Sequence, residues 1–240
     1  WWQSSNAYQN NIDENRRYYQ KLKESNSSKS TSKSSSKSSS KASSKSGTKT
    51  SSKSTSQTKK STKAYRYTHS ASITRQVNDE MIGVLRSQIQ RNGMLNAQIE
   101  QELKQLKNAD LVGKVRKALS AEGYDTNSIA TAMAYYLVMN YAVATQADAS
   151  TLKAHTFVKQ LEDTMAEDGS LANMSNTDKQ RMADMLYWGG SLIIAKYSEA
   201  QRTGNRAHLN TVIKEANYTL SQMGLSTSQL KNGANGLELR

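Results

Sequence analysis

The chain of 240 residues contains no cysteine and no proline. Without cysteine it can form no disulfide framework, no thiolate nucleophile and no zinc or iron–sulfur site with cysteine ligands. Proline removes a backbone donor and restrains the residue before it, so its absence leaves long helices uninterrupted. The composition therefore favours a helical protein without cysteine chemistry.

Negative charge is missing from one long segment. Residues 27–63 carry ten lysines and no acidic residue, whereas residues 1–26 have a net charge of +1 and residues 64–240 a net charge of +2. The overall charge of +13 therefore belongs mainly to this segment. A folded nucleic-acid-binding domain usually carries a basic face of its own, which the nearly neutral residues 64–240 do not indicate.

Apolar side chains are almost absent from the same segment, which is rich in serine. A lysine recurs there at every fourth position over seven repeats: Lys29, Lys33, Lys37, Lys41, Lys45, Lys49 and Lys53. Like charges four residues apart repel one another on a helix, and so polar a segment cannot bury enough surface to fold. We expect residues 27–63 to be a disordered linker that its evenly spaced charges keep extended.

The same seven lysines form a candidate anion-binding arm. A polycationic segment can bind nucleic acid, lipid headgroups or acidic envelope polymers without sequence specificity. Such binding is weak and decreases steeply as salt rises, because mobile ions screen the exposed charges. Linker and anion-binding arm are alternative interpretations of one feature.

Long hydrophobic runs are also missing. The longest, AMAYYLVMNYAVA at 132–144, contains Asn140 and is shorter than the roughly 18–20 residues of a membrane span. We therefore expect no transmembrane segment and interpret this run as a buried helix. The chain begins at Trp1 rather than methionine, so either it is a fragment or a segment was removed. We interpret this start as removal of a signal peptide and expect a periplasmic or secreted protein.

The first 26 residues form a short segment rich in aromatic residues. They include Trp1, Trp2, Tyr8, Tyr18 and Tyr19. One interpretation is an unstructured N-terminus, and the other is a docking peptide at the end of the linker.

Helical periodicity begins at about residue 65. Apolar residues spaced three and four apart predict seven helices, near 72–91, 94–107, 111–121, 127–146, 150–167, 177–202 and 205–223. The sequence shows no alternation of apolar and polar residues that would predict a β-strand instead. We expect the tail from residue 230 to fray. Residues 64–240 are enough for one hydrophobic core. We predict an all-α fold, an irregular orthogonal bundle of about six to seven helices.

Glycines mark several of the predicted helix ends. Gly123 followed by Tyr124 and Gly224 followed by Leu225 are typical of Schellman stops, in which glycine takes a positive φ and the next residue makes an apolar contact. One of the polar residues at 125–127 should then cap the fourth helix.

Two further glycines, Gly189 and Gly190, lie inside the sixth predicted helix. Each costs about 1 kcal/mol relative to alanine at such a position. We expect the backbone of the alanine-rich fourth helix to pack closely there.

No motif for catalysis is visible. The three histidines lie far apart without HxxxH or HExxH spacing, and GxSxG, P-loop and GxGxxG motifs are absent. We therefore predict a protein that is not an enzyme, with no metal and no cofactor.

Two clusters are candidate interaction sites. Tyr65, Arg66 and Tyr67 follow the linker and form either a strap packed on the domain or a contact for a partner. Tyr135, Tyr136 and Asn140 put polar groups on an otherwise apolar helix. Because a buried asparagine must be satisfied, they indicate either internal hydrogen bonds or a groove that opens to a ligand or partner helix.

Three stretches together resemble an uncharacterised family of exported bacterial helical proteins. They are AYRYTHSASITRQ at 64–76, ALSAEGYDTNSIATAMAYYLVMNYA at 118–142 and TLSQMGLSTSQL at 219–230. The resemblance covers roughly 64–230 and departs from the family pattern where Tyr135 and Tyr136 replace tryptophans. The resemblance implies export and an all-α fold, and it implies no activity.

These observations predict an exported helical domain, 64–240, on a basic tether, with an unknown protein or envelope component as its partner. The alternative is nonspecific polyanion binding through the lysine-rich arm.

Overall fold

The computed structural model describes residues 64–234 and 236–240. The predictions for the aromatic segment, the linker and the lysine arm lie outside these residues. The described helices are α2 (Ala71–Arg91), α3 (Ala97–Asn108), α4 (Leu111–Ala121), α5 (Ile129–Thr145), α6 (His155–Asp168), α7 (Asn176–Arg202) and α8 (Arg206–Gln222). Each contains most of one predicted segment, so the all-α prediction is confirmed.

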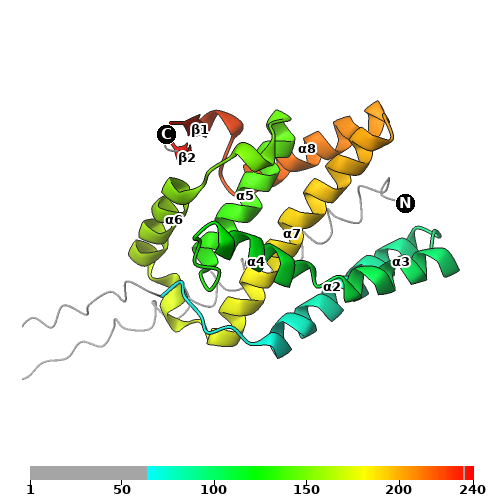
Figure 1. Cartoon of the computed structure of the whole chain (residues 1–240), viewed down its shortest axis with the longest axis horizontal. Helices are drawn as coiled ribbons and strands as arrows, with labels where there is room; N and C mark the ends of the chain where they lie inside the picture. The colour runs from blue at the N-terminus through cyan, green and yellow to red at the C-terminus, as the bar shows by residue number, and fades with distance from the viewer. Residues whose placement is uncertain (1–63, 235) are drawn as a thin grey trace, which may run out of the picture.

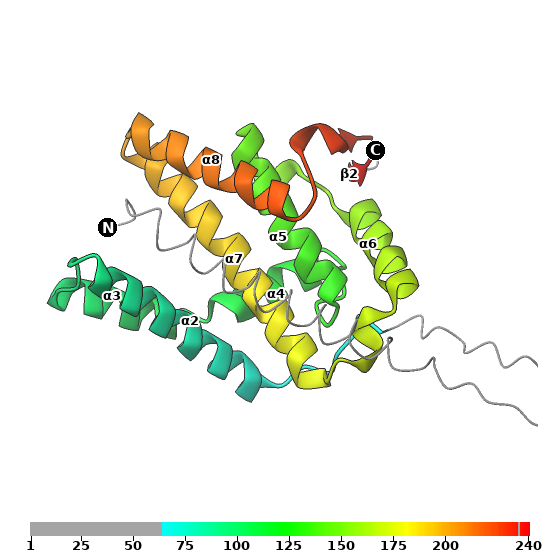
Figure 2. The same ribbon diagram turned by 180° about the vertical axis from the view of Figure 1, so that it is seen from behind.

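Helix α7 is the longest element and runs through the middle of the molecule (Figure 1). Helix α5 packs along one side of it, and α8 contacts both of these helices. Helix α2 lies against α7 from another direction and pairs with α3, as the reverse view also shows (Figure 2). Helix α6 covers the face of α5 that α7 leaves free.

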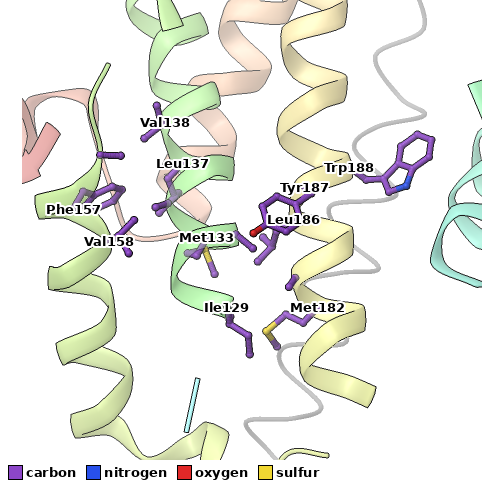
Figure 3. Close-up of a cluster of buried hydrophobic side chains, with 14 of the residues drawn as sticks. Ile129, Met133, Leu137, Val138, Phe157, Val158, Met182, Leu186, Tyr187 and Trp188 are labelled. Atoms are coloured by element: carbon purple, nitrogen blue, oxygen red, sulfur yellow. The ribbon is translucent and has the colours of Figure 1, made fainter. Parts of the chain in front are cut away.

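The core surrounds α5, whose residues are apolar on nearly every face. Phe157 of α6 packs on one side of it, and Tyr187 of α7 points toward it from the other (Figure 3). Both side chains are fully buried. Each large apolar side chain buried in this way contributes roughly 1.5–3 kcal/mol. The prediction of a buried helix at 132–144 is therefore confirmed.

The sequence analysis predicted a frayed C-terminal tail, and this prediction is wrong. Strands β1 (Leu230–Gly233) and β2 (Gly236–Leu239) pair antiparallel as a short hairpin. Leu237 is fully buried, and its amide donates to the carbonyl of Lys153 at 2.6 Å. Because this contact lies far away in sequence, local periodicity could not reveal it.

Side-chain caps move several helix starts from their predicted positions. Helix α3 begins at residue 97 because Asn96 accepts the amide of Ile99 at 3.0 Å. Ser128, not a residue of 125–127, caps α5 by accepting the amide of Thr131 at 3.4 Å. Helix α6 begins at residue 155, after a separate 3-10 turn (Ala149–Thr151).

The glycine predictions describe the structure well. Gly123 and Gly224 have φ of +85° and +74°, and the residue after each donates back to the helix as in a Schellman motif. At Gly190 a Cβ atom would lie 2.7 Å from the Tyr135 ring and 3.3 Å from the Tyr136 Cα. Helix α5 is the close neighbour, as predicted, but its tyrosines rather than its alanines make the contact.

Candidate functional site

Residues Tyr65–Tyr67 lie along the N-terminal end of α5. The amide of Ile129 donates to the Tyr65 carbonyl at 2.9 Å, and the Tyr67 amide donates to the Asn127 carbonyl at 3.0 Å. Tyr65 and Tyr67 are buried, whereas Arg66 is exposed and forms an ion pair with Asp125. This segment, which we call the strap, is therefore held against the domain.

Arg116 of α4 joins the strap to the loop before α5. Its guanidinium donates to the Tyr67 hydroxyl at 2.8 Å, to the Thr126 carbonyl at 2.8 Å and to Asn127 Oδ1 at 2.6 Å. The Tyr67 hydroxyl donates in turn to the Thr126 carbonyl at 2.9 Å. Burial raises the pKa of Tyr67 well above its ordinary value, so the phenol stays protonated and keeps this donor.

The second predicted cluster lies where α5 meets α7 and α8. The Tyr135 hydroxyl is 3.1 Å from Ser191 Oγ, and Asn140 Nδ2 donates to the Tyr136 carbonyl at 2.8 Å. Burial raises the pKa of Tyr136 to about 12. Asn140 is fully buried, and its Oδ1 has no hydrogen-bond partner among the described residues. The structure therefore places these groups within the packed helices, apart from the strap.

A third polar cluster, which the sequence analysis missed, fixes the chain between the strap and α2. The amide of Thr68 donates to Asn176 Oδ1 at 2.6 Å, and Asn176 Nδ2 returns a bond to the Thr68 carbonyl at 2.9 Å. Gln180 repeats this exchange with the backbone of Ser70 at 2.8 and 2.7 Å. We call these contacts, with Asp184 and Thr74, the α7 clamp.

Asp184 is the charged end of the α7 clamp and is fully buried. Thr74 Oγ1 donates to Asp184 Oδ2 at 2.8 Å, and Gln180 Nε2 lies 3.3 Å from the same oxygen. Burial raises the pKa of Asp184, although both hydrogen bonds oppose the shift. Asn176, Gln180 and Asp184 recur at every fourth position, and this polar stripe on one helix face is the signal that could have revealed the clamp.

A buried ion pair joins α7 to α8 near the other end of α7. Lys196 Nζ donates to both carboxylate oxygens of Glu215 at 2.7 Å, and the side chains are 6% and 3% exposed. Burial lowers the pKa of Lys196 and raises that of Glu215, while the mutual attraction opposes both shifts. Sequence spacing did not predict this pair, because its partners lie on different helices.

An apolar groove lies between α4, α5 and α6. Its volume is about 260 Å³. Its lining includes Val115, Ala118, Leu119, Glu122, Tyr124, Thr131, Ala134, Tyr135, Val138, Met139, Leu152, Ala154 and Val158. We call it the α4–α6 groove. Of the predicted interaction residues, only Tyr135 contributes to its lining.

The described residues show neither a metal-binding cluster nor a membrane span. No three histidine, aspartate or glutamate side chains among them come together as metal ligands. None of the described helices combines the length and hydrophobicity that crossing a bilayer requires.

Comparison with known proteins gives a family and nothing more. The model of a family of unknown function, DUF6683, matches residues 4–240, so the chain belongs to this family. The match extends beyond the region 64–230 that suggested an uncharacterised family, and it begins within the aromatic segment. No curated protein and no solved structure matches the chain.

Proposed function

We propose that this protein is a non-enzymatic, exported bacterial helical domain that a basic tether positions for contact with a protein or envelope component. We further propose that it acts in the periplasm or outside the cell. The observation that carries this proposal is the strap, because Tyr65–Tyr67, which follow residues 27–63 closely in the sequence, are bonded to the domain.

Several hydrogen bonds hold the strap in place. Its backbone bonds to Asn127 and Ile129 act together with the hydrogen bonds from Arg116 to Tyr67 and Thr126. Hydrogen bonds to a charged group are stronger than neutral ones. The first residues that the structure describes are therefore braced on the domain, which supports a role in which the domain is presented on a tether.

The helical domain and the lysine-rich segment differ in charge. Residues 64–240 carry a net charge of only +2, so contacts made by the domain should depend little on salt. The alternative function, nonspecific polyanion binding, is favoured by the ten lysines of residues 27–63. Such binding should weaken steeply with salt.

The test is a crosslinked pull-down from cell-envelope extract at low and high salt. The whole chain is compared with a whole-chain variant in which the seven regularly spaced lysines become glutamine. If both recover the same salt-resistant protein, the domain makes the contact. If only the unaltered chain binds, and salt releases it, the arm is the binding element. Fractionation of the source cells tests the proposed location.

A further inference from the structure

We propose that the α4–α6 groove is a binding site for a small uncharged aromatic molecule that carries one N–H or O–H group, of the indole or phenol class. This site is separate from the tethered contact proposed above. The strap and the α7 clamp supply none of its lining residues.

The size and lining of the groove limit the class of ligand. An apolar cavity of about 150 Å³ is enough for a benzene ring, and drug-sized ligands use cavities of about 300–1,000 Å³. At about 260 Å³ the groove suits one or two fused rings. Tyr124, Tyr135 and Met139 line it, and aromatic rings and thioethers both make favourable contacts with an aromatic ligand.

Thr131, one of the lining residues, carries a buried side-chain oxygen that lacks a partner among the described residues. Thr131 is 1% exposed, and its Oγ1 has no hydrogen-bond partner among the described residues. A buried hydroxyl without a partner is costly, because it has lost its bonds to water. The N–H of an indole or the O–H of a phenol would satisfy this oxygen while the ring fills the apolar space.

The charge at the groove disfavours anions. Glu122 is exposed and is the one charged side chain among the described residues that line the groove. No lysine or arginine is present in that lining to pair with a carboxylate or phosphate. Fatty acids and aromatic acids are therefore poor candidates, and a neutral ring with a single polar group is the better match.

The proposal is tested by titrating the whole chain with indole and with indene, which has a similar shape but no N–H. Methyl ¹H–¹³C spectra report binding, with Met139 and Ala134 as reporters in the groove. We expect indole to shift these methyl signals and to bind about three- to ten-fold more tightly than indene, the range for one hydrogen bond.

Thr131→Val tests the hydrogen bond. It removes the hydroxyl and keeps the shape, so indole should lose its advantage over indene. Equal binding of the two probes to the unaltered chain, or a preference that survives in Thr131→Val, would overturn the assignment of Thr131.

Ala118→Phe tests the location. The new ring occupies the groove and should reduce indole binding at least ten-fold. Ala121→Phe is the matched control, because Ala121 is exposed on the same helix and does not line the groove. Undiminished binding in Ala118→Phe, or methyl shifts confined to other regions, would show that the groove is not the site. Thermal unfolding of each variant confirms that it is folded.

Discussion

The two ends of α7 bury polar groups in different ways. Near its N-terminus, the α7 clamp uses amide and hydroxyl groups to hold the backbone of Thr68 and Ser70. Near its C-terminus, Lys196 forms a buried ion pair with Glu215 of α8. The clamp joins segments about 110 residues apart in sequence, whereas the ion pair joins residues 19 apart.

The difference shows what each arrangement contributes. Paired hydrogen bonds to an extended backbone fix where that segment lies, because amide and peptide groups must meet in register. A buried ion pair contributes little net stability compared with apolar residues of similar volume, yet it is costly to break. The clamp therefore specifies position, while the ion pair makes the α7–α8 contact intolerant of single changes.

The largest expected effect is loss of the ion pair. Glu215→Ala leaves Lys196 buried without its carboxylate and should lower the free energy of unfolding by about 3–5 kcal/mol. Urea unfolding followed by circular dichroism measures this change. The double variant Lys196→Met with Glu215→Leu is the control, and its stability should equal or exceed that of the unaltered chain. A double variant as unstable as Glu215→Ala would contradict this account.

Breaking the α7 clamp should lower the free energy of unfolding by less than loss of the ion pair does. Gln180→Ala removes the bonds to both backbone groups of Ser70, but Ser70 is only half-buried, so water can replace part of these bonds and the total cost should be about 1–3 kcal/mol. Hydrogen exchange should increase in the first turn of α2, while α8 remains protected. Exchange that rises equally in both helices would show that the clamp does not act locally.

A substitution in the middle of α7, between the clamp and the ion pair, tests the close packing of α5 on α7. Gly190→Ala places a Cβ 2.7 Å from the Tyr135 ring and should destabilise the fold by about 1–3 kcal/mol. Gly83→Ala in α2 is the matched control, since its Cβ meets nothing within 4 Å. That variant should gain up to about 1 kcal/mol from helix propensity. Thermal unfolding of both variants measures the two changes in stability. If both variants are destabilised, or both stabilised, the account of close packing at Gly190 is wrong.

The smallest effect is the dependence of the clamp on pH. Burial raises the pKa of Asp184, so the folded chain keeps this proton to a higher pH than the unfolded chain does. The stability that Asp184 contributes is full below its unfolded pKa of about 3.9 and is lost as pH rises through the folded value. The stability of the unaltered chain relative to Asp184→Asn should therefore decrease as pH rises above about 3.9.

Urea unfolding across this range measures that difference. His69 lies 3.2 Å from Thr74 and also titrates, with a pKa that burial lowers. Repeating the comparison with His69→Gln in both proteins separates the two groups. A difference that is flat or rises with pH would contradict the assignment to Asp184.

Local signals in the sequence predicted much of the helical framework. Asp110 accepts the Gly113 amide at the start of α4 and Ser175 accepts the Asp178 amide at the start of α7, and such caps are local because they involve residues only three apart. The hairpin at 230–239 escaped prediction because Leu237 is held by Lys153, far away in the chain. Among the candidate sites, the sequence pointed to the strap and to Tyr135, Tyr136 and Asn140, whereas the α7 clamp and the α4–α6 groove depend on which helices meet.

The sequence by itself determined the helical class, the central place of α5 and the concentration of charge in residues 27–63, because periodicity and composition are local properties. Only the tertiary structure decided that Asn176 and Gln180 hold the backbone of Thr68 and Ser70, and that Lys196 meets Glu215. It also decided that α4, α5 and α6 leave a hollow beside Thr131. These features depend on which helix faces meet, and that choice is made by packing across the whole domain.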